Sequence, residues 1–378
     1  MKYFLVALVF LLSMGQLGRI QISQNISFYL HDILILMFFG TVIFDLLKNP
    51  KKIIEKVKKN KKFPKKIIFS LIASIFLSWI ISAVNKDFDY RSILYTLRFL
   101  GYWLFAYLLQ TTNHHQAKPW VLTAFLLMLF GFIQYFFLPD LRFINLMGYD
   151  DHFYRLSGTI LDPSFLGLIL VFALNYQLLS KNPRWPLVIL MAIAIALTYS
   201  RAVYLAFLLS ASLIVYYQKS VSWRPKLLLI IIGFILLLPA LPKQSGGAGV
   251  DLGRTFTITQ RFDNNKAALE KMTAKDWLIG RGLFSPIDRN SSQTITTHAH
   301  FPDNILVLLI SNLGILGTGL AVILFWQALK TSNQLQKVLF WSLLIHSMFN
   351  HNLTHSFVMM LFWGFFYSRN STSMTRSV

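Results

Sequence analysis

Long apolar stretches recur from one end of the chain to the other, with short polar segments between them. A helix needs about 20 mostly apolar residues to cross a bilayer, because lipid offers its backbone no hydrogen-bond partner. Only 13% of the 378 residues are charged, whereas a soluble domain carries roughly 25%. We therefore expect an all-α, polytopic membrane protein in which residues 1–378 form a single transmembrane domain.

About twelve of these stretches have the character of transmembrane helices. The predicted spans are 3–18, 28–47, 67–84, 92–110, 119–138, 159–180, 186–200, 202–217, 227–242, 303–329, 338–350 and 353–368. Residues 243–302 are too polar to cross a membrane, so they are expected to form one large loop containing short helices. The apolar spacing over Thr259–Lys275 predicts a helix there, and the glycines of Trp277–Gly282 predict a turn.

The orientation of the chain follows from one lysine-rich segment. Ten lysines lie between Lys48 and Lys66, and short loops rich in lysine and arginine stay in the cytoplasm. Alternation of the spans then places both termini in the cytoplasm and the loop 243–302 outside. Such loops also explain the formal charge of +21, because they contact anionic lipid headgroups of the bilayer. We expect a multi-pass protein of the cytoplasmic membrane that does not bind nucleic acid.

Arginines within and beside the spans are the first candidates for function, because charge is costly there. Arg98 lies inside the fourth span, where we expect it to pair with a carboxylate or to reach a polar cavity. Arg155 precedes Asp162-Pro163, a pattern that predicts a helix start with free N–H groups suited to an anion. Arg201 lies between two spans that are almost contiguous. Arg155 and Arg201 could also be ordinary interfacial cations whose stems lie along apolar surface.

Three further arginines belong to the predicted outer loop. Arg254, Arg261 and Arg281 are each, taken singly, typical of solvated loop cations. Together with Arg155 and Arg201 they make the outer side rich in guanidinium, against the general preference for cations inside. An anionic ligand on the outer side would explain this distribution.

The large loop closes with the sequence Thr-His-Ala-His-Phe-Pro-Asp-Asn, which contains His298, His300 and Asp303. Two histidines at this spacing could bind a metal, but no third ligand is evident, so no metal or other cofactor is expected. A histidine or a hydrogen-bonded aspartate can instead act as a general base toward a hydroxyl. Gly314 and Gly317 follow inside the next span and are expected to allow close helix packing.

The order of these motifs resembles the O-antigen ligase and polysaccharide polymerase family of bacterial envelopes. The motifs run, in chain order, from Arg-x-Ser-Gly at Arg155 and Ser-Arg at Arg201, through an arginine-led helix and Trp-x-x-Gly-x-Gly in the large loop, to Asp303-Asn304 and Gly314-x-x-Gly317. The resemblance covers the region from Arg155 to Gly317. The family pattern has histidine where this chain has Asp303, and often Asn-Pro-Asn where it has Asp162-Pro163-Ser164, which favours a polymerase over a strict ligase.

The resemblance implies a GT-C-like membrane glycosyltransferase that needs no metal. Its donor would be an oligosaccharide on undecaprenyl pyrophosphate, and its product a longer glycan such as an O-antigen, a capsule or an exopolysaccharide. The residues implied are Asp303, His300 and His298 for catalysis at the acceptor, and Arg155, Arg201, Arg261 and Arg281 for the pyrophosphate. Other polysaccharide assembly proteins are possible partners.

Three alternatives stay open at this point. A ligase would transfer the glycan to the lipid core of a lipopolysaccharide. A flippase or transporter of lipid-linked oligosaccharides also commonly has twelve spans, but it would place its site near the membrane midplane, often between internal repeats. No repeat is evident, and the candidate residues lie on one predicted face. In a non-catalytic membrane scaffold, the outer arginines would have no ligand.

Overall fold

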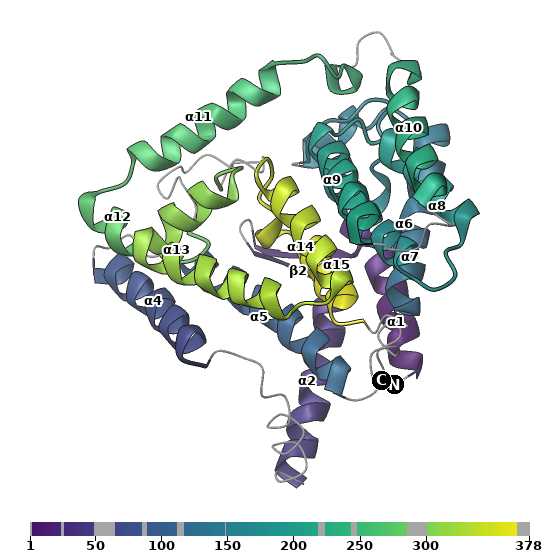
Figure 1. Cartoon of the computed structure of the whole chain (residues 1–378). Coiled ribbons are helices and arrows are strands. Elements are labelled where there is room, and N and C mark those ends of the chain that lie inside the picture. The colour runs from purple at the N-terminus through teal and green to yellow at the C-terminus, as the bar shows by residue number, and fades with distance from the viewer. Residues whose placement is uncertain are drawn as a thin grey trace. The chain divides into compact units, whose positions relative to one another are not determined.

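The computed structural model describes residues 2–23, 26–48, 65–84, 89–111, 117–147, 149–217, 224–242, 248–285 and 301–368. The chain folds into two compact units (Figure 1). The first unit comprises residues 1–18, 116–257 and 333–378, and the second comprises residues 19–115 and 258–332. Each unit is therefore assembled from segments that are far apart in the sequence.

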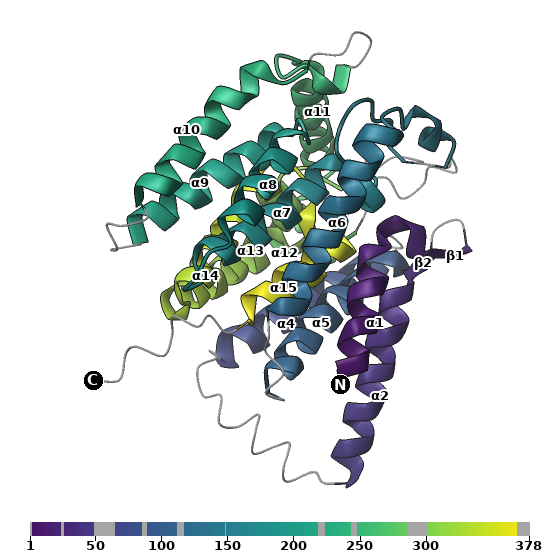
Figure 2. The same cartoon turned by 90° about the vertical axis from the view of Figure 1, so that its right-hand side faces the viewer.

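The first unit is built from helices around α7 (Pro163–Leu178), in which every residue except Tyr176 is buried. Its other α-helices are α1 (Lys2–Ser13), α6 (Lys118–Phe137), α8 (Trp185–Ala196), α9 (Arg201–Tyr217), α10 (Arg224–Ala240), α14 (Gln334–Ser347) and α15 (Ser356–Phe366). Short 3-10 helices lie at η1 (Gly15–Gly18), η2 (Arg142–Met147), η3 (Gly158–Ile160), η4 (Ala248–Val250) and η5 (Asn352–Thr354). Helices α6, α8, α9, α14 and α15 all pack against α7, and Figure 2 shows α6 and α8 beside it.

Helix α7 begins where the sequence analysis predicted, but two of its first N–H groups are bonded to Asp162 and are therefore not free for an anion. The Asp162 side chain accepts hydrogen bonds from the backbone N–H groups of Ser164 and Phe165, with Pro163 in the first helical turn. Aspartate caps a helix by satisfying N–H groups that have no partner within the helix. Proline suits the first turn because its missing N–H would be unpaired there in any case. The capping aspartate therefore fixes where α7 begins.

The second unit combines helices with one β-hairpin. Strand β1 (Arg19–Ser23) pairs with β2 (Ile26–Tyr29) in antiparallel register, with Arg19 opposite Tyr29. Its α-helices are α2 (Leu30–Lys48), α4 (Lys65–Val84), α5 (Tyr90–Thr111), α11 (Phe256–Glu270), α12 (Ala274–Ile279) and α13 (Ile305–Thr331). Helix α13 packs against both α4 and α12, which lie beside it in Figure 1. The sequence analysis did not predict this hairpin, because residues 19–27 lie between the predicted spans 3–18 and 28–47.

Two glycines determine how α12 approaches α13. Gly314 has φ of 63° inside α13, where it interrupts the regular helix, and a Cβ there would overlap the Ile279 backbone nitrogen. At Gly280, with φ of 84°, a Cβ would overlap the Asn312 carbonyl. Positive φ and direct backbone contact both favour glycine. The predicted close packing is therefore present at Gly314, and a Cβ at Gly317 would lie 3.2 Å from the Ser74 hydroxyl of α4.

The described helices coincide with all twelve predicted spans, although their ends differ by several residues. Three of them are long and apolar enough to cross a membrane by length and composition, namely Tyr90–Gln110, Lys118–Phe137 and Ile305–Thr331. Six further helices are apolar but shorter. A helical membrane protein is thus supported, while the number of twelve spans stays a prediction. The helix predicted at Thr259–Lys275 is present but begins at Phe256, ends at Glu270 and is followed by the separate helix α12.

Candidate functional site

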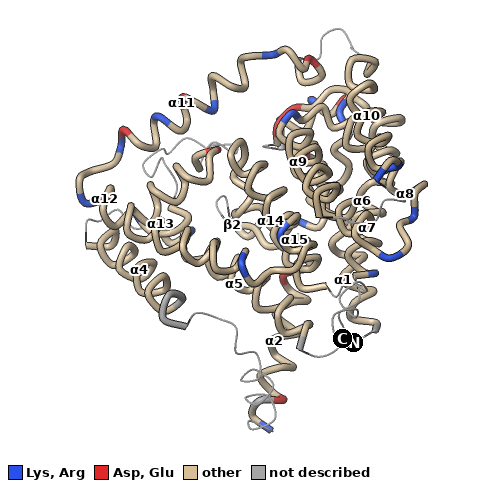
Figure 3. Tube along the Cα trace, viewed as in Figure 1, with Lys and Arg blue, Asp and Glu red and all other residues tan. Residues whose placement is uncertain are grey.

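Lysine and arginine lie mainly at helix ends and along α11 (Figure 3). The first unit contains three arginines that lie close together, where the segment after α8 contacts the segment before α11. They are Arg155, Arg201 and Arg254. The Arg155 Nε donates to the Thr198 carbonyl at 3.0 Å, and a Cβ at Gly249 would lie 3.0 Å from the Arg155 side chain. The Arg254 Nη1 donates to the Gly249 carbonyl, and its Nη2 lies 3.4 Å from the Tyr199 carbonyl. We call these three arginines the guanidinium cluster.

Arg201 has the most informative surroundings in the guanidinium cluster. Its Nη1 donates to the carbonyl oxygens of Leu252 and Arg254 at 3.3 and 2.8 Å, and its Nη2 donates to the Thr257 hydroxyl at 3.0 Å. These partners are all uncharged, and within the described residues no carboxylate forms an ion pair with Arg201. Its charge is therefore held in place without being neutralised, which suits an anionic ligand.

A chain of hydrogen bonds lies directly beside the guanidinium cluster and is almost fully buried. The Ser164 hydroxyl lies 2.8 Å from the Ser200 hydroxyl and 3.0 Å from the His346 Nε2. The His346 Nδ1 lies 2.9 Å from the Asn352 Oδ1, and the Asn352 amide nitrogen donates to the Ser347 hydroxyl at 2.7 Å. Because Asn352 presents its oxygen to His346, Nδ1 carries the proton and Nε2 accepts one from Ser164.

This hydrogen-bond chain joins the starts of α7 and α9 to the end of α14. Ser164 follows the Asp162 cap, Ser200 directly precedes Arg201, and His346 is fully buried. The sequence analysis did not single out His346. Its signal was present, because an ionisable side chain inside a predicted span is a candidate for function by default. What the sequence did not reveal is the pairing with Ser164, which is 182 positions away.

The predicted catalytic residue Asp303 belongs to the second unit. The Asn264 amide nitrogen of α11 donates to its carboxylate at 3.3 Å, and the Asn304 backbone nitrogen donates to the Asn265 side chain at 3.2 Å. Asn304 then caps α13 by accepting from the backbone nitrogens of Leu306 and Val307. Two neighbouring asparagines of α11 thus hold the Asp-Asn pair at the start of α13. His298 and His300 lie outside the described residues.

The two remaining predicted arginines also belong to the second unit, and they differ in their surroundings. Arg281 forms an ion pair with Asp276 at 3.1 Å, and its backbone nitrogen donates to the Ser311 carbonyl. Asp276 itself closes the capping box of α12 with Thr273. These contacts give Arg281 a clear structural role in joining α12 to α13. Arg261 lies in the middle of α11 with a partly exposed side chain.

The structure therefore brings Arg155 and Arg201 together with Arg254 in one unit, and it places Arg261, Arg281 and Asp303 in the other. Arg254 appeared in the sequence only as one of several outer cations, and its contacts with Gly249 and Tyr199 make it a member of the guanidinium cluster. The signal for it was the excess of arginine in the predicted outer loop.

Residues 186–322 match the model of a protein family described as O-antigen ligase. The match supports the predicted resemblance to this family. It includes Arg201, Arg254 and Asp303, whereas Arg155 and His346 lie outside it. A comparison with curated protein sequences finds no match.

The O-antigen ligase family gives the coarse function of the chain. Its members are glycosyltransferase-like enzymes that act in a membrane on lipid-linked polysaccharide. An O-antigen ligase-like or polymerase-like function is therefore supported for this chain, and so is its expected place in a membrane. Because the match begins at α8 and ends within α13, it covers Arg201 and Arg254 of the guanidinium cluster and the Asp303-Asn304 pair.

Proposed function

We propose that this protein is a polysaccharide polymerase. It transfers a glycan from undecaprenyl pyrophosphate to a hydroxyl group of an acceptor sugar at the outer face of the cytoplasmic membrane. The observation that carries the proposal is the guanidinium cluster, in which Arg201 is held by uncharged oxygens and lacks a carboxylate partner in the described residues. Such a group binds the diphosphate of a lipid-linked donor.

The reaction exchanges one bond for another. The acceptor oxygen forms a bond to the anomeric carbon of the donor sugar, while the bond from that carbon to the pyrophosphate oxygen breaks. The departing lipid pyrophosphate gains negative charge, and the fixed donors of Arg155, Arg201 and Arg254 stabilise this charge. Guanidinium groups supply bidentate donors to phosphate, so this step requires no metal.

The acceptor hydroxyl has to lose a proton in the same reaction. We assign this role to Asp303, with His300 and His298 as further candidates in the same sequence motif. An aspartate with a hydrogen-bond donor at its carboxylate, here Asn264, is held ready to accept a proton. Aspartate in place of the family's histidine favours the polymerase over the ligase in this proposal.

The decisive experiment supplies purified protein with an undecaprenyl-pyrophosphate-linked repeat unit and follows glycan length on a gel. A ladder of products indicates a polymerase, whereas a single transfer to an added lipid core indicates a ligase. Arg201→Gln should lower the rate about 100-fold, as expected when a fixed donor to a developing charge is lost. Arg184→Gln is the matched control, because Arg184 is an exposed arginine of the same unit at the start of α8.

A second arm tests the proton acceptor. Asp303→Asn keeps the shape of the side chain but removes its basicity, so elongation should fall roughly 100-fold or more. Asp303→His restores the family's residue and should recover a measurable rate. If Arg201→Gln or Asp303→Asn elongates as fast as the wild type, the assignment of that residue is wrong. If repeat units only cross the membrane without elongation, the protein is a flippase.

A further inference from the structure

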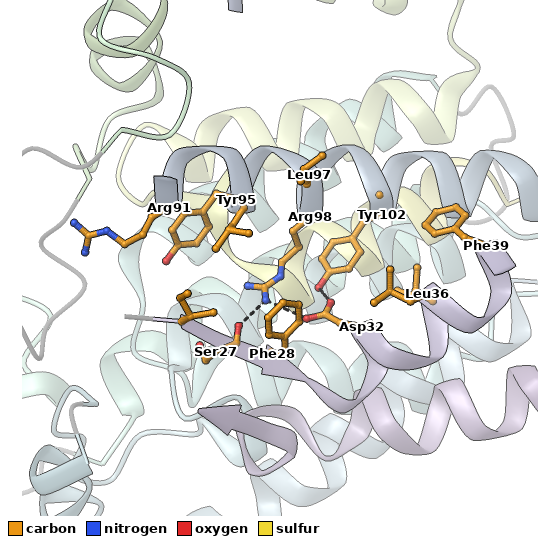
Figure 4. A pocket seen from close by; sticks show the side chains of 14 residues that line it. Ser27, Phe28, Asp32, Leu36, Phe39, Arg91, Tyr95, Leu97, Arg98 and Tyr102 are labelled. Atoms are coloured by element: carbon orange, nitrogen blue, oxygen red, sulfur yellow. Dashed lines mark hydrogen bonds and ion pairs between the residues drawn. The ribbon is translucent and has the colours of Figure 1, made fainter. Parts of the chain in front are cut away.

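The second unit contains a cavity of about 280 Å³ between α2 and α5. Its wall is formed by the strand β2, one face of α2 and one face of α5 (Figure 4). None of the residues assigned to glycan transfer lines it. Cavities that bind small ligands usually have volumes of roughly 300–1,000 Å³, so this space lies near the lower end of that range and suits a small headgroup or part of one chain.

One end of the cavity is polar. The Nη2 of Arg98 donates to the Ser27 carbonyl at 2.7 Å and forms an ion pair with Asp32 at 3.1 Å. Both of these contacts use Nη2, so the Nε and Nη1 groups of Arg98 donate to no other residue in the described part of the chain. Arg98 also lies over the rings of Phe28 and Tyr29. The Arg98 guanidinium is thus held in one position, and its Nε and Nη1 groups can donate hydrogen bonds to a ligand.

The carboxylate beside Arg98 is already fully engaged. Asp32 accepts hydrogen bonds from the Tyr102 hydroxyl and from the Tyr29 backbone nitrogen. With the ion pair to Arg98, both of its oxygens have partners. Asp32 therefore positions Arg98 and does not itself need a ligand in the cavity.

The other end of the cavity is apolar. Toward the C-terminal ends of the two helices, its walls are Ile35, Leu36 and Phe39 of α2 and Gly101 of α5. Helices α2 and α5 run in the same direction here, since His31 contacts Tyr102 while Phe38 contacts Phe105. The cavity thus passes from guanidinium to hydrocarbon along the helix axes. This is the polarity of a lipid, with a charged head followed by an apolar chain.

The charges around the cavity limit which headgroup fits. Arg91, at its polar rim, is paired with Asp89, and Arg98 is paired with Asp32. The two positive charges are therefore balanced, and the cavity offers spare hydrogen-bond donors but no surplus charge. A phosphate diester carries a single negative charge, which the spare hydrogen-bond donors of Arg98 can stabilise, whereas a diphosphate carries more charge than these donors can stabilise. The guanidinium cluster differs in its charge, because Arg201 has no carboxylate partner in the described residues and its positive charge is not balanced.

We propose that this cavity binds a membrane phospholipid, with its phosphate at the free donors of Arg98 and one acyl chain between α2 and α5. This lipid is distinct from the glycan donor. The proposal does not rest on the proposed glycan transfer, because it concerns other residues and another ligand. Its role is to fill the space that the packing of α2 against α5 leaves open.

Gly101 provides a test that leaves every hydrogen bond in place. A Cβ at Gly101 would have only the Phe39 ring near it, at 4.0 Å, so Gly101→Leu fills the apolar end of the cavity. Gly40→Leu is the matched control, because a Cβ at Gly40 has no atom within 4 Å and Gly40 does not line the cavity. Arg98→Lys keeps the positive charge beside Asp32 but removes the planar fork of donors.

The full-length protein, purified in a nonionic detergent, is titrated with phosphatidylethanolamine or phosphatidylglycerol, and bound lipid is counted by native mass spectrometry. The wild type and Gly40→Leu should each retain one phospholipid, while Gly101→Leu should bind about tenfold more weakly because overpacking excludes the chain. Arg98→Lys should also bind more weakly. Inorganic phosphate and dodecyl maltoside, which each lack one part of the ligand, should not compete.

Three results would overturn the proposal. Equal binding by Gly101→Leu and the wild type would place the lipid elsewhere. Competition by dodecyl maltoside would show that the phosphate is not recognised. Displacement of the phospholipid by low concentrations of undecaprenyl pyrophosphate would identify the cavity as part of the donor site. Because the measurement counts bound lipid, it is independent of whether the protein elongates a glycan.

Discussion

At the residue scale, the arginines of this chain fall into two chemical classes. Arg98 and Arg281 have carboxylate partners, Asp32 and Asp276 respectively. Arg201 is held by two carbonyl oxygens and one hydroxyl. A paired arginine already has its charge balanced, whereas an arginine among uncharged oxygens keeps its charge available for a ligand. The neutral surroundings of Arg201, more than its mere presence, thus support its role at the diphosphate.

His346 gives the first prediction at this scale. It is fully buried between Ser164 and Asn352. Replacing it with alanine leaves both partners unsatisfied, and a buried polar group without a partner costs about 1–3 kcal/mol. His346→Ala should therefore lower the free energy of unfolding by about 3 kcal/mol, measured as a lower midpoint of thermal unfolding in detergent.

Ser200→Ala is the control for His346, because Ser200 stands at the end of the hydrogen-bond chain and is bonded to Ser164. Its loss leaves the bond from Ser164 to His346 intact, so the cost should be about 0.6 kcal/mol, as is common for hydrogen bonds between membrane helices. If Ser200→Ala destabilises the protein as much as His346→Ala, the chain of hydrogen bonds does not act in the order described.

At the scale of elements, the sequence predicted the helices well and their irregularities poorly. Apolar length locates a helix, and Asp162-Pro163 locates the start of α7, because both depend on neighbouring residues only. The β-hairpin at Arg19–Tyr29 and the break in α13 at Gly314 depend on what the segment meets in space. The same reason explains why the cluster of Arg155 with Arg254 could not be derived from sequence position.

The break in α13 leads to a second prediction. Gly314→Ala puts a Cβ into the Leu278–Ile279 backbone and a side chain at positive φ. A strained backbone of this kind costs on the order of 1–3 kcal/mol, so the variant should unfold at a clearly lower temperature. Gly319→Ala, in the same helix with no atom within 4 Å of the new Cβ, should be neutral or stabilising. Equal behaviour of the two variants would show that the contact between α12 and α13 is not tight.

At the scale of the whole molecule, the family match and the apolar helices support a membrane enzyme, and its orientation is a prediction from charge. The ten lysines between Lys48 and Lys66 predict a cytoplasmic location for that segment, because such segments resist transfer across the membrane. If the predicted spans alternate from there, the segments that carry Arg155, Arg254 and Asp303 lie outside, where a lipid-linked glycan donor would meet them.

The absence of cysteine makes this orientation directly testable. Lys275 lies exposed in the predicted outer loop, and Lys181 lies exposed in a predicted cytoplasmic loop. In intact cells, a maleimide that cannot cross membranes should label Lys275→Cys and leave Lys181→Cys unlabelled until the membrane is opened. Both variants should be labelled equally after detergent treatment, which controls for accessibility. If only Lys181→Cys is labelled in intact cells, the guanidinium cluster faces the cytosol, and glycan transfer at the outer face is ruled out.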